Sequence, residues 1–171
     1  MTRIYVGPVP LVDLGTVGET ALLGAFDGDI VVPQLVADAV STEPAKTNLA
    51  KFVADGDATI ELIDTEYAEQ AQAILGVSEP VVESRLLEPV LGAMSERDEA
   101  TPIGLVTDDR PFRTIADGLG ATVTGTFGVV VRAASEDKYL KTTQAKRIVR
   151  RIDSHGLHLT GELRAEAIGD V

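Results

Sequence analysis

The sequence lacks several residue types that carry common chemistries. Its 171 residues include no cysteine and no tryptophan, only two histidines, and 4% aromatic residues. Without cysteine the chain forms no disulfide framework, no zinc site with thiolate ligands and no thiol nucleophile. Two histidines are also too few for a histidine-rich metal site. These absences exclude disulfide scaffolds, thiol enzymes and the usual zinc proteins.

Long apolar runs are absent as well. No run approaches the ~18–20 residues of a membrane-spanning helix, and the N-terminus lacks the basic and then apolar pattern of a signal peptide. Hydrophobic residues still make up 44% of the chain, which is too many for a disordered acidic polymer. We therefore expect a cytoplasmic protein with no membrane partner, folded as a single domain over residues 1–171.

Familiar catalytic motifs are missing too. The chain contains neither G-x-G-x-x-G nor G-x-x-x-x-G-K-[ST], so dinucleotide binding and P-loop NTPase activity lack support. It also has no G-x-S-x-G nucleophile elbow. These other chemistries therefore have little support in the sequence.

Basic residues are scarce relative to acids. Fifteen lysines and arginines stand against 27 aspartates and glutamates, which gives a net charge of −12. Abundant carboxylate with only five lysines is typical of a surface that stays hydrated in concentrated salt, so a halophilic host is one interpretation and an ordinary acidic protein the other. Over the whole chain the charge disfavours nucleic acid, because phosphates are neutralised by lysine and arginine.

The charge is, however, unevenly spread. Residues 1–109 carry a net charge of −15, whereas residues 110–171 carry +3. Such asymmetry favours a polyanionic partner for the basic part, although a solvated helix face gives the same pattern. The candidate nucleic-acid-binding residues are Arg110, Arg113, Lys138, Lys141, Lys146, Arg147, Arg150 and Arg151.

Short apolar runs alternate with helical spacing along the chain. Strands are predicted at residues 3–6, 29–32, 58–62, 103–107 and 121–124. Helices are predicted at about 10–25, 33–40, 44–54, 66–75, 79–95, 111–118, 127–135, 142–155 and 160–168. Strands separated by helices indicate a parallel sheet covered on both faces, hence an α/β domain with its C-terminal helices, about 142–170, packed on it or extending it.

One acidic pair stands at a favourable place. Asp108 and Asp109 directly follow the predicted strand at 103–107 and open the next helix. Ligands of parallel sheets bind beyond the carboxyl ends of the strands, and carboxylates there suit Mg²⁺ or Mn²⁺. Capping of the helix is the alternative use of the same residues. A metal site needs further acids, for which Asp13, Asp38, Glu83 and Glu88 are the candidates.

Two motifs in the second half resemble the PIN domain family. The segment Leu105–Arg110 reads L-V-T-D-D-R, and Gly125–Ala133 reads G-T-F-G-V-V-V-R-A. This resembles a branch with a TDDR motif, a following GT-x-G-V motif and two C-terminal helices, the last opening as in Leu157–Leu163. The N-terminal half agrees only in outline. The resemblance implies a three-layer α/β/α sandwich around a mainly parallel sheet.

The same resemblance implies a function. PIN domains hydrolyse RNA with Mg²⁺ or Mn²⁺ held by three or four carboxylates, and the metals activate the attacking water. Many are toxins paired with an antitoxin, others process RNA, and dimers are common. The implied partners are therefore RNA, an antitoxin-like or other protein, and a second copy of the chain. Asp109 and Asp108 are the implied catalytic and metal-binding residues, and Asp109 fits the Thr-x-Asp spacing better.

The other acids of the family are not matched here. Gly7 stands where the family has the acid that ends the first strand, and Ala39 stands at its second acid, with Asp38 one residue early. The third acid has no clean match, since Glu83 and Glu88 are only the nearest. Asp13 lies further along the first helix and is a candidate replacement for the first acid.

Two hypotheses follow from these departures. In the first, Asp108 and Asp109 with Asp13, Asp38 or Glu83 form the site of a metal-dependent endoribonuclease. In the second, which we favour, the loss of acids at Gly7 and Ala39 weakens or abolishes catalysis. The chain is then a PIN-like module that binds RNA or a protein without a resident metal. A receiver-like phosphoacceptor domain fits poorly, because Gly7 and Pro8 stand where its acids should follow the first strand.

Overall fold

The sheet at the centre of the protein has five parallel strands. The computed structural model describes residues 2–96, 102–135 and 140–154. The strands are β1 (Arg3–Val6), β2 (Asp29–Pro33), β3 (Thr59–Glu61), β4 (Ile103–Val106) and β5 (Thr122–Thr124), in the order β3-β2-β1-β4-β5. Every neighbouring pair runs parallel. All five predicted strands are therefore confirmed, and the sheet is wholly parallel where it was expected to be mainly so.

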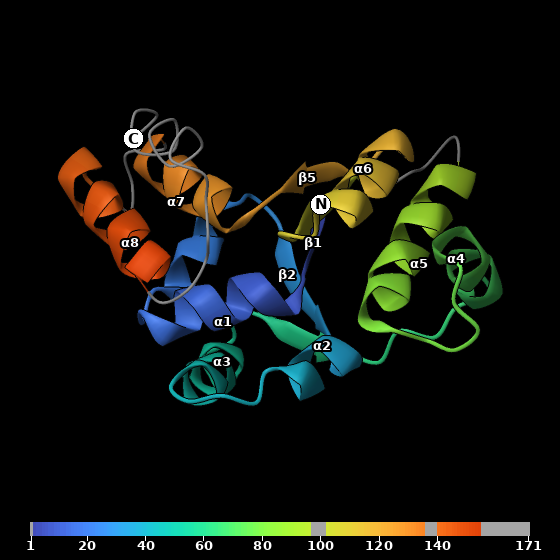
Figure 1. Ribbon diagram of the computed structural model, residues 1–171, viewed down its shortest axis with the longest axis horizontal. Helices are drawn as coiled ribbons and strands as arrows, with labels where there is room; N and C mark the ends of the chain where they lie inside the picture. The colour runs from blue at the N-terminus through green and yellow to red at the C-terminus, as the bar shows by residue number, and fades with distance from the viewer. Residues whose placement is uncertain (1, 97–101, 136–139, 155–171) are drawn as a thin grey trace.

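Helices form a layer on each side of the sheet (Figure 1). The first layer contains α1 (Pro8–Thr16), the 3₁₀ helix η1 (Thr20–Ala25), α3 (Ala45–Ala54), α7 (Thr126–Ser135) and α8 (Thr142–Ser154). The second contains α4 (Ala68–Leu75), α5 (Val82–Ser95) and α6 (Arg110–Gly118), while the short α2 (Gln34–Ala39) contacts both α1 and α5. The predicted α/β/α sandwich is thus confirmed. The helix expected at 160–168 lies outside the described residues.

The order of the strands decides which face of the sheet each connecting helix covers. The chain moves from β1 to β2 to β3 in one direction, then crosses back to β4 and β5. Because parallel crossovers are right-handed, the reversal places the connecting helices on opposite faces of the sheet. The three central strands are mainly apolar, and their residues Val6, Val31, Val32, Leu105 and Val106 are almost fully buried, whereas the short edge strands β3 and β5 are not.

The predicted helix at 10–25 is wrong in one respect, because the structure breaks it in two. Gly18 adopts a left-handed backbone conformation, with φ of 74°. The amide of Glu19 then donates to the carbonyl oxygen of Leu14 at 2.8 Å, which closes the end of α1. The chain resumes as η1, so the apolar spacing continues across a turn that the periodicity alone did not reveal.

No helix in the described part of the chain is long and apolar enough to cross a membrane.

Candidate acidic site

The carboxyl ends of β1, β4 and β5 meet at one edge of the sheet. The amide of Gly7 donates to the carbonyl oxygen of Val106 at 2.8 Å, and the amide of Thr107 donates to that of Thr124 at 2.8 Å. These bonds carry the parallel pairing one residue beyond each strand. The edge therefore brings Gly7, Thr107 and the two acids after Thr107 together, at the place where such sheets bind ligands.

Asp108 is bound to the start of α7. Its Oδ1 accepts the amide of Thr126 at 2.9 Å, and its Oδ2 accepts the hydroxyl of Thr126. A Cβ on Gly125 would lie 2.5 Å from Oδ1 of Asp108 and 3.3 Å from Nη1 of Arg113, so only glycine leaves room for this contact. The Gly-Thr pair of the GT-x-G-V motif therefore holds the Asp108 carboxylate, a role that the sequence pattern did not reveal.

Asp109 caps the next helix. Its Oδ1 accepts the amide of Phe112 at 2.9 Å, and its backbone is extended at the N-cap position of α6. An aspartate at this position satisfies a free helix amide and interacts favourably with the helix dipole. Both members of the acidic pair thus bind a helix start, the role that the sequence left open as the alternative to metal binding.

Asp13 lies on the second turn of α1 and is close enough to Asp108 to feel its charge. Its Oδ2 is buried and has no hydrogen-bond partner. Burial, and secondly the negative charge of Asp108, raise the pKa of Asp13 to about 6. The structure thereby brings together two of the acids that the sequence singled out. A buried oxygen without a partner is costly unless a proton or a cation fills the place.

Gly7 is buried at the same edge of the sheet. Its backbone is extended, with φ −80° and ψ 172°, which any residue adopts. A Cβ there would lie 3.4 Å from the carbonyl oxygen of Val106, 3.6 Å from Oγ1 of Thr107 and 3.7 Å from Cδ1 of Leu86, all of which an ordinary side chain tolerates. The position thus has room for a Cβ but carries no acid.

Two further candidate acids, Asp38 and Glu83, lie on α2 and α5. Asp38 is exposed on α2, where its Oδ1 accepts the side-chain amide of Gln34 at 2.9 Å. Glu83 lies in the first turn of α5 and is partly buried, one turn before Leu86, the residue that faces Gly7. Glu83 is therefore on the helix that approaches the site, whereas Asp38 is engaged with its own helix.

Glu88 is buried and bound by Thr65 and Arg85. It is 1% exposed, and its Oε1 accepts the amide and the hydroxyl of Thr65, each at 2.8 Å. Its Oε2 pairs with Arg85 at 2.9 Å, and Arg85 also reaches Asp64 at 3.5 Å. This network ties α5 to the segment after β3 and accounts for a buried acid that the sequence left ambiguous.

The candidate basic residues fall into two groups. Arg110 and Arg113 follow the acidic pair directly on α6, and Arg110 is exposed. The rest lie on or just before α8, where Lys141, Arg147 and Arg150 are exposed and Lys146 is partly buried. Arg151 of this helix donates to the carbonyl oxygen of Val17 at 2.9 Å and approaches Glu19 at 4.0 Å, and Lys138 lies outside the described residues.

The donor set does not fit a resident catalytic metal. Among residues 2–96, 102–135 and 140–154, no three acidic or histidine side chains converge in a geometry that could hold an ion. Both oxygens of Asp108 and one of Asp109 already accept hydrogen bonds from helix amides or a hydroxyl. Mg²⁺ dehydrates reluctantly and requires near-octahedral oxygen ligation, which the buried oxygen of Asp13 alone does not supply.

Comparison with known proteins agrees with this fold. A family model described as "DUF3368: PIN domain" matches residues 8–171. No curated protein and no solved structure matches the chain. The match extends over nearly the whole sequence and includes both the acidic pair and the GT-x-G-V motif. The chain therefore belongs to the PIN domain family.

Proposed function

We propose that this PIN domain binds single-stranded RNA at the acidic edge of its sheet without cutting it efficiently. The proposal rests on the absence of an acid at position 7, where the first strand ends in Gly7. In addition, the carboxylate of Asp108 is hydrogen-bonded to Thr126 at the start of α7. PIN domains are nuclease-related proteins, so RNA is the ligand class that family membership supports. The missing carboxylates concern catalysis, and the binding of RNA does not require them.

Several features support RNA as the ligand. Arg110 and Arg113 lie on the first turn of α6, next to Asp109, where a phosphodiester passing the site would meet their guanidinium groups. The N-termini of α6 and α7 also lie at this edge, but Asp109 and Asp108 already bind their amides, so the two arginines are the groups that would bind phosphate. The exposed residues Arg147 and Arg150 of α8, with Lys141 just before this helix, add a second basic surface for the sugar–phosphate backbone.

A second candidate function is a weak Mn²⁺- or Mg²⁺-dependent endoribonuclease. It is favoured by the unpaired, buried Oδ2 of Asp13 and by the effect of Asp108 on the pKa of Asp13. An ion bound by these two acids would share the Asp108 carboxylate with Thr126 and would need a third acid, such as Glu83, to approach. A protein-binding role, with an antitoxin-like partner or a second copy, rests on family membership alone.

The experiment that separates these functions measures binding and cleavage of one RNA in parallel. A 5′-fluorescein-labelled single-stranded RNA is titrated with the protein by fluorescence anisotropy, at low salt and at high salt, with EDTA or Mn²⁺. The same mixtures are then resolved on denaturing gels. Wild type and Asp109→Asn are compared, with Asp117→Asn as the matched control, because Asp117 is an exposed acid at the other end of α6.

The proposal predicts binding in EDTA, no metal-dependent cleavage, and equal RNA affinity for wild type and both variants. Cleavage that requires Mn²⁺ and disappears in Asp109→Asn alone would establish the second candidate instead. Absence of RNA binding at every salt concentration would overturn both functions and leave a protein partner to be sought.

A further inference from the structure

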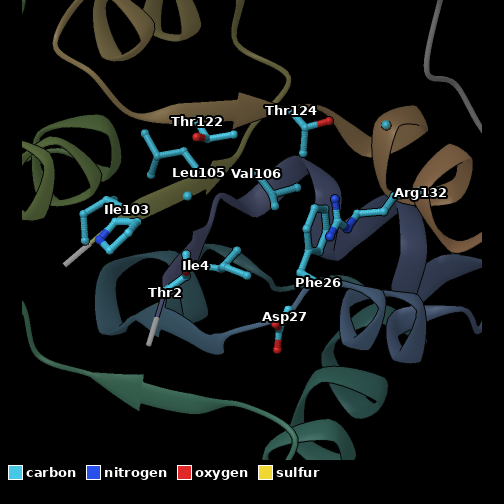
Figure 2. Close-up of a pocket in the computed structure, with 13 residues that line it drawn as sticks. Thr2, Ile4, Phe26, Asp27, Ile103, Leu105, Val106, Thr122, Thr124 and Arg132 are labelled. Atoms are coloured by element: carbon cyan, nitrogen blue, oxygen red, sulfur yellow. The ribbon is translucent and has the colours of Figure 1, made fainter. Parts of the chain in front are cut away.

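A cavity of about 380 Å³ lies on the α7 side of the sheet, over β1, β4 and β5 (Figure 2). Its floor includes Ile4 and Val106, which project to the same face because they lie on paired strands two residues apart in register. Gly104, paired with Ile4, contributes no side chain. The volume is within the range of small-molecule sites and is too large to be a packing defect.

The aromatic ring of Phe26 lines this cavity, and Arg132 packs against one of its faces. The guanidinium carbon of Arg132 lies 5.2 Å from the ring centre of Phe26, and Nε of Arg132 donates to the carbonyl oxygen of Ala25 at 3.3 Å. Figure 2 shows the ring with Arg132 on one side and with Ile4 and Val106 on the other. The Phe26 ring is therefore fixed by its cationic neighbour while it lines the cavity.

The cavity and the acidic site are built on the same two strands, β4 and β5. Val106 precedes Asp108 by two residues, about 7 Å of extended chain. Thr124 lines the cavity from the neighbouring strand. It lies two residues before Thr126, which binds Asp108. The cavity and the acidic edge are therefore within the length of a few nucleotides of each other.

We propose that the cavity receives one base of the bound RNA, stacked on Phe26. The inference rests on the proposed RNA binding and specifies how the strand is held. Single-stranded RNA is recognised by bases that leave the stack and lie against aromatic or guanidinium planes, and the apolar floor of Ile4 and Val106 suits such a flat ring. Asp27, exposed at the rim, disfavours a phosphate in the same place. Stacking tolerates any base, so the site selects single strands rather than a sequence.

The test uses the absence of tryptophan from the chain. Phe26→Trp places the single tryptophan of the variant in the cavity, where it is excited selectively at about 295 nm, and Tyr67→Trp places it on the opposite layer, beside α4. Each variant is titrated with rA₈, with an rA₈ of which the bases have been removed, and with free adenosine. A second variant, Thr122→Tyr, fills the cavity with a larger side chain. Its control is Thr59→Tyr, because both threonines are exposed on three-residue edge strands and, of the two, Thr122 lines the cavity.

The proposal predicts that rA₈ and adenosine quench the fluorescence of the Phe26→Trp variant and leave that of Tyr67→Trp unchanged, and that abasic RNA quenches neither. Thr122→Tyr should weaken rA₈ binding about tenfold, the share of one stacked base, with no change in Thr59→Tyr. In wild-type protein, adenosine should shift the backbone amide signals of Gly104 and Gly128, which line the cavity, a readout that does not depend on any variant.

RNA binding without quenching, without an effect of Thr122→Tyr and without the two glycine shifts would overturn the base pocket and leave the proposed function intact. If RNA does not bind, the proposed function fails, and the adenosine titration still shows whether the cavity binds a base. Absence of glycine shifts at saturating adenosine then overturns the base pocket as well.

Discussion

Asp108 binds the first residue of α7 with both oxygens of its carboxylate, since Thr126 donates its amide to one and its hydroxyl to the other. This contact joins the end of β4 to the start of the helix that follows β5. It also occupies one of the two acids that match the PIN motif. The acids of this site therefore stabilise the fold first, and that commitment has measurable consequences.

Removing the Thr126 hydroxyl should destabilise the protein. Thr126 is fully buried, so Thr126→Val leaves Oδ2 of Asp108 without its donor, at a cost of about 1–3 kcal/mol in the free energy of unfolding. Urea denaturation followed by circular dichroism measures the change. Thr126→Ser, which keeps the hydroxyl, should recover most of the stability. Equal stability of the valine variant and wild type would show that the contact contributes nothing.

The stability of the protein should fall as pH rises through the acid range because of Asp13. Its pKa is raised to about 6 in the folded state, above the ~3.9 of an unfolded aspartate, so the folded chain holds the proton more tightly. The contribution of protonated Asp13 is therefore fully present below about pH 4 and is lost as the pH rises through about 6.

Asp13→Asn should remove this slope, so that the variant gains stability over wild type above pH 6. Thermal unfolding at pH steps between about 4 and 8 gives the profile. Asp117→Asn removes an exposed charge from α6 and serves as the control. Parallel profiles for wild type and Asp13→Asn would contradict the buried, unpaired state of the Asp13 carboxyl.

Restoring the acid at position 7 should create a metal site. A Cβ at Gly7 would be in ordinary contact with Thr107, so Gly7→Asp adds a carboxylate at the sheet edge that also carries Asp108. Without metal the added charge should lower the melting temperature through repulsion, and Mn²⁺ should raise it by several degrees. Gly118→Asp, at an open position on α6, should show no Mn²⁺ effect. A Gly7→Asp variant indifferent to Mn²⁺ would show that position 7 does not belong to the site.

The arginines of α6 should govern the salt dependence of RNA binding. Each phosphate contact contributes about 0.7 to the slope of log affinity against log salt for single strands. Replacing Arg110 and Arg113 by alanine should therefore reduce the slope by about 1.4 and weaken binding at low salt. Lys46→Ala with Lys51→Ala removes the same charge from exposed positions on α3 and should leave the slope unchanged. An equal loss of slope in both double variants would mean that the α6 arginines make no specific phosphate contact.

Most of the architecture could be predicted from local patterns. Apolar runs such as Ile103–Val106 and the spacing of buried residues in α5 and α8 are set by neighbours in sequence, and they placed the five strands and the described helices. The break at Gly18 could not be predicted in this way, because Leu22 and Ala25 keep an apolar spacing compatible with one longer helix. The backbone conformation of a single glycine separates α1 from η1.

The site was predictable in its position but not in its bonding. The acidic pair after β4 is indicated by its place at a strand end. The partner of Asp108, however, lies eighteen residues away beyond the end of another strand, and no local pattern indicates that Gly125 must stay small for the two to meet. The coupling of Asp13 to Asp108 likewise depends on which side of α1 faces the sheet edge.

Direct titration of wild-type protein with Mn²⁺, followed by electron paramagnetic resonance of the free ion, tests the central claim that this acidic edge holds no resident catalytic metal. With Asp108 committed to Thr126 and glycine at position 7, we predict only weak binding, equal in wild type and Asp13→Asn. A single tight Mn²⁺ site in wild type that disappears in Asp13→Asn would contradict the claim.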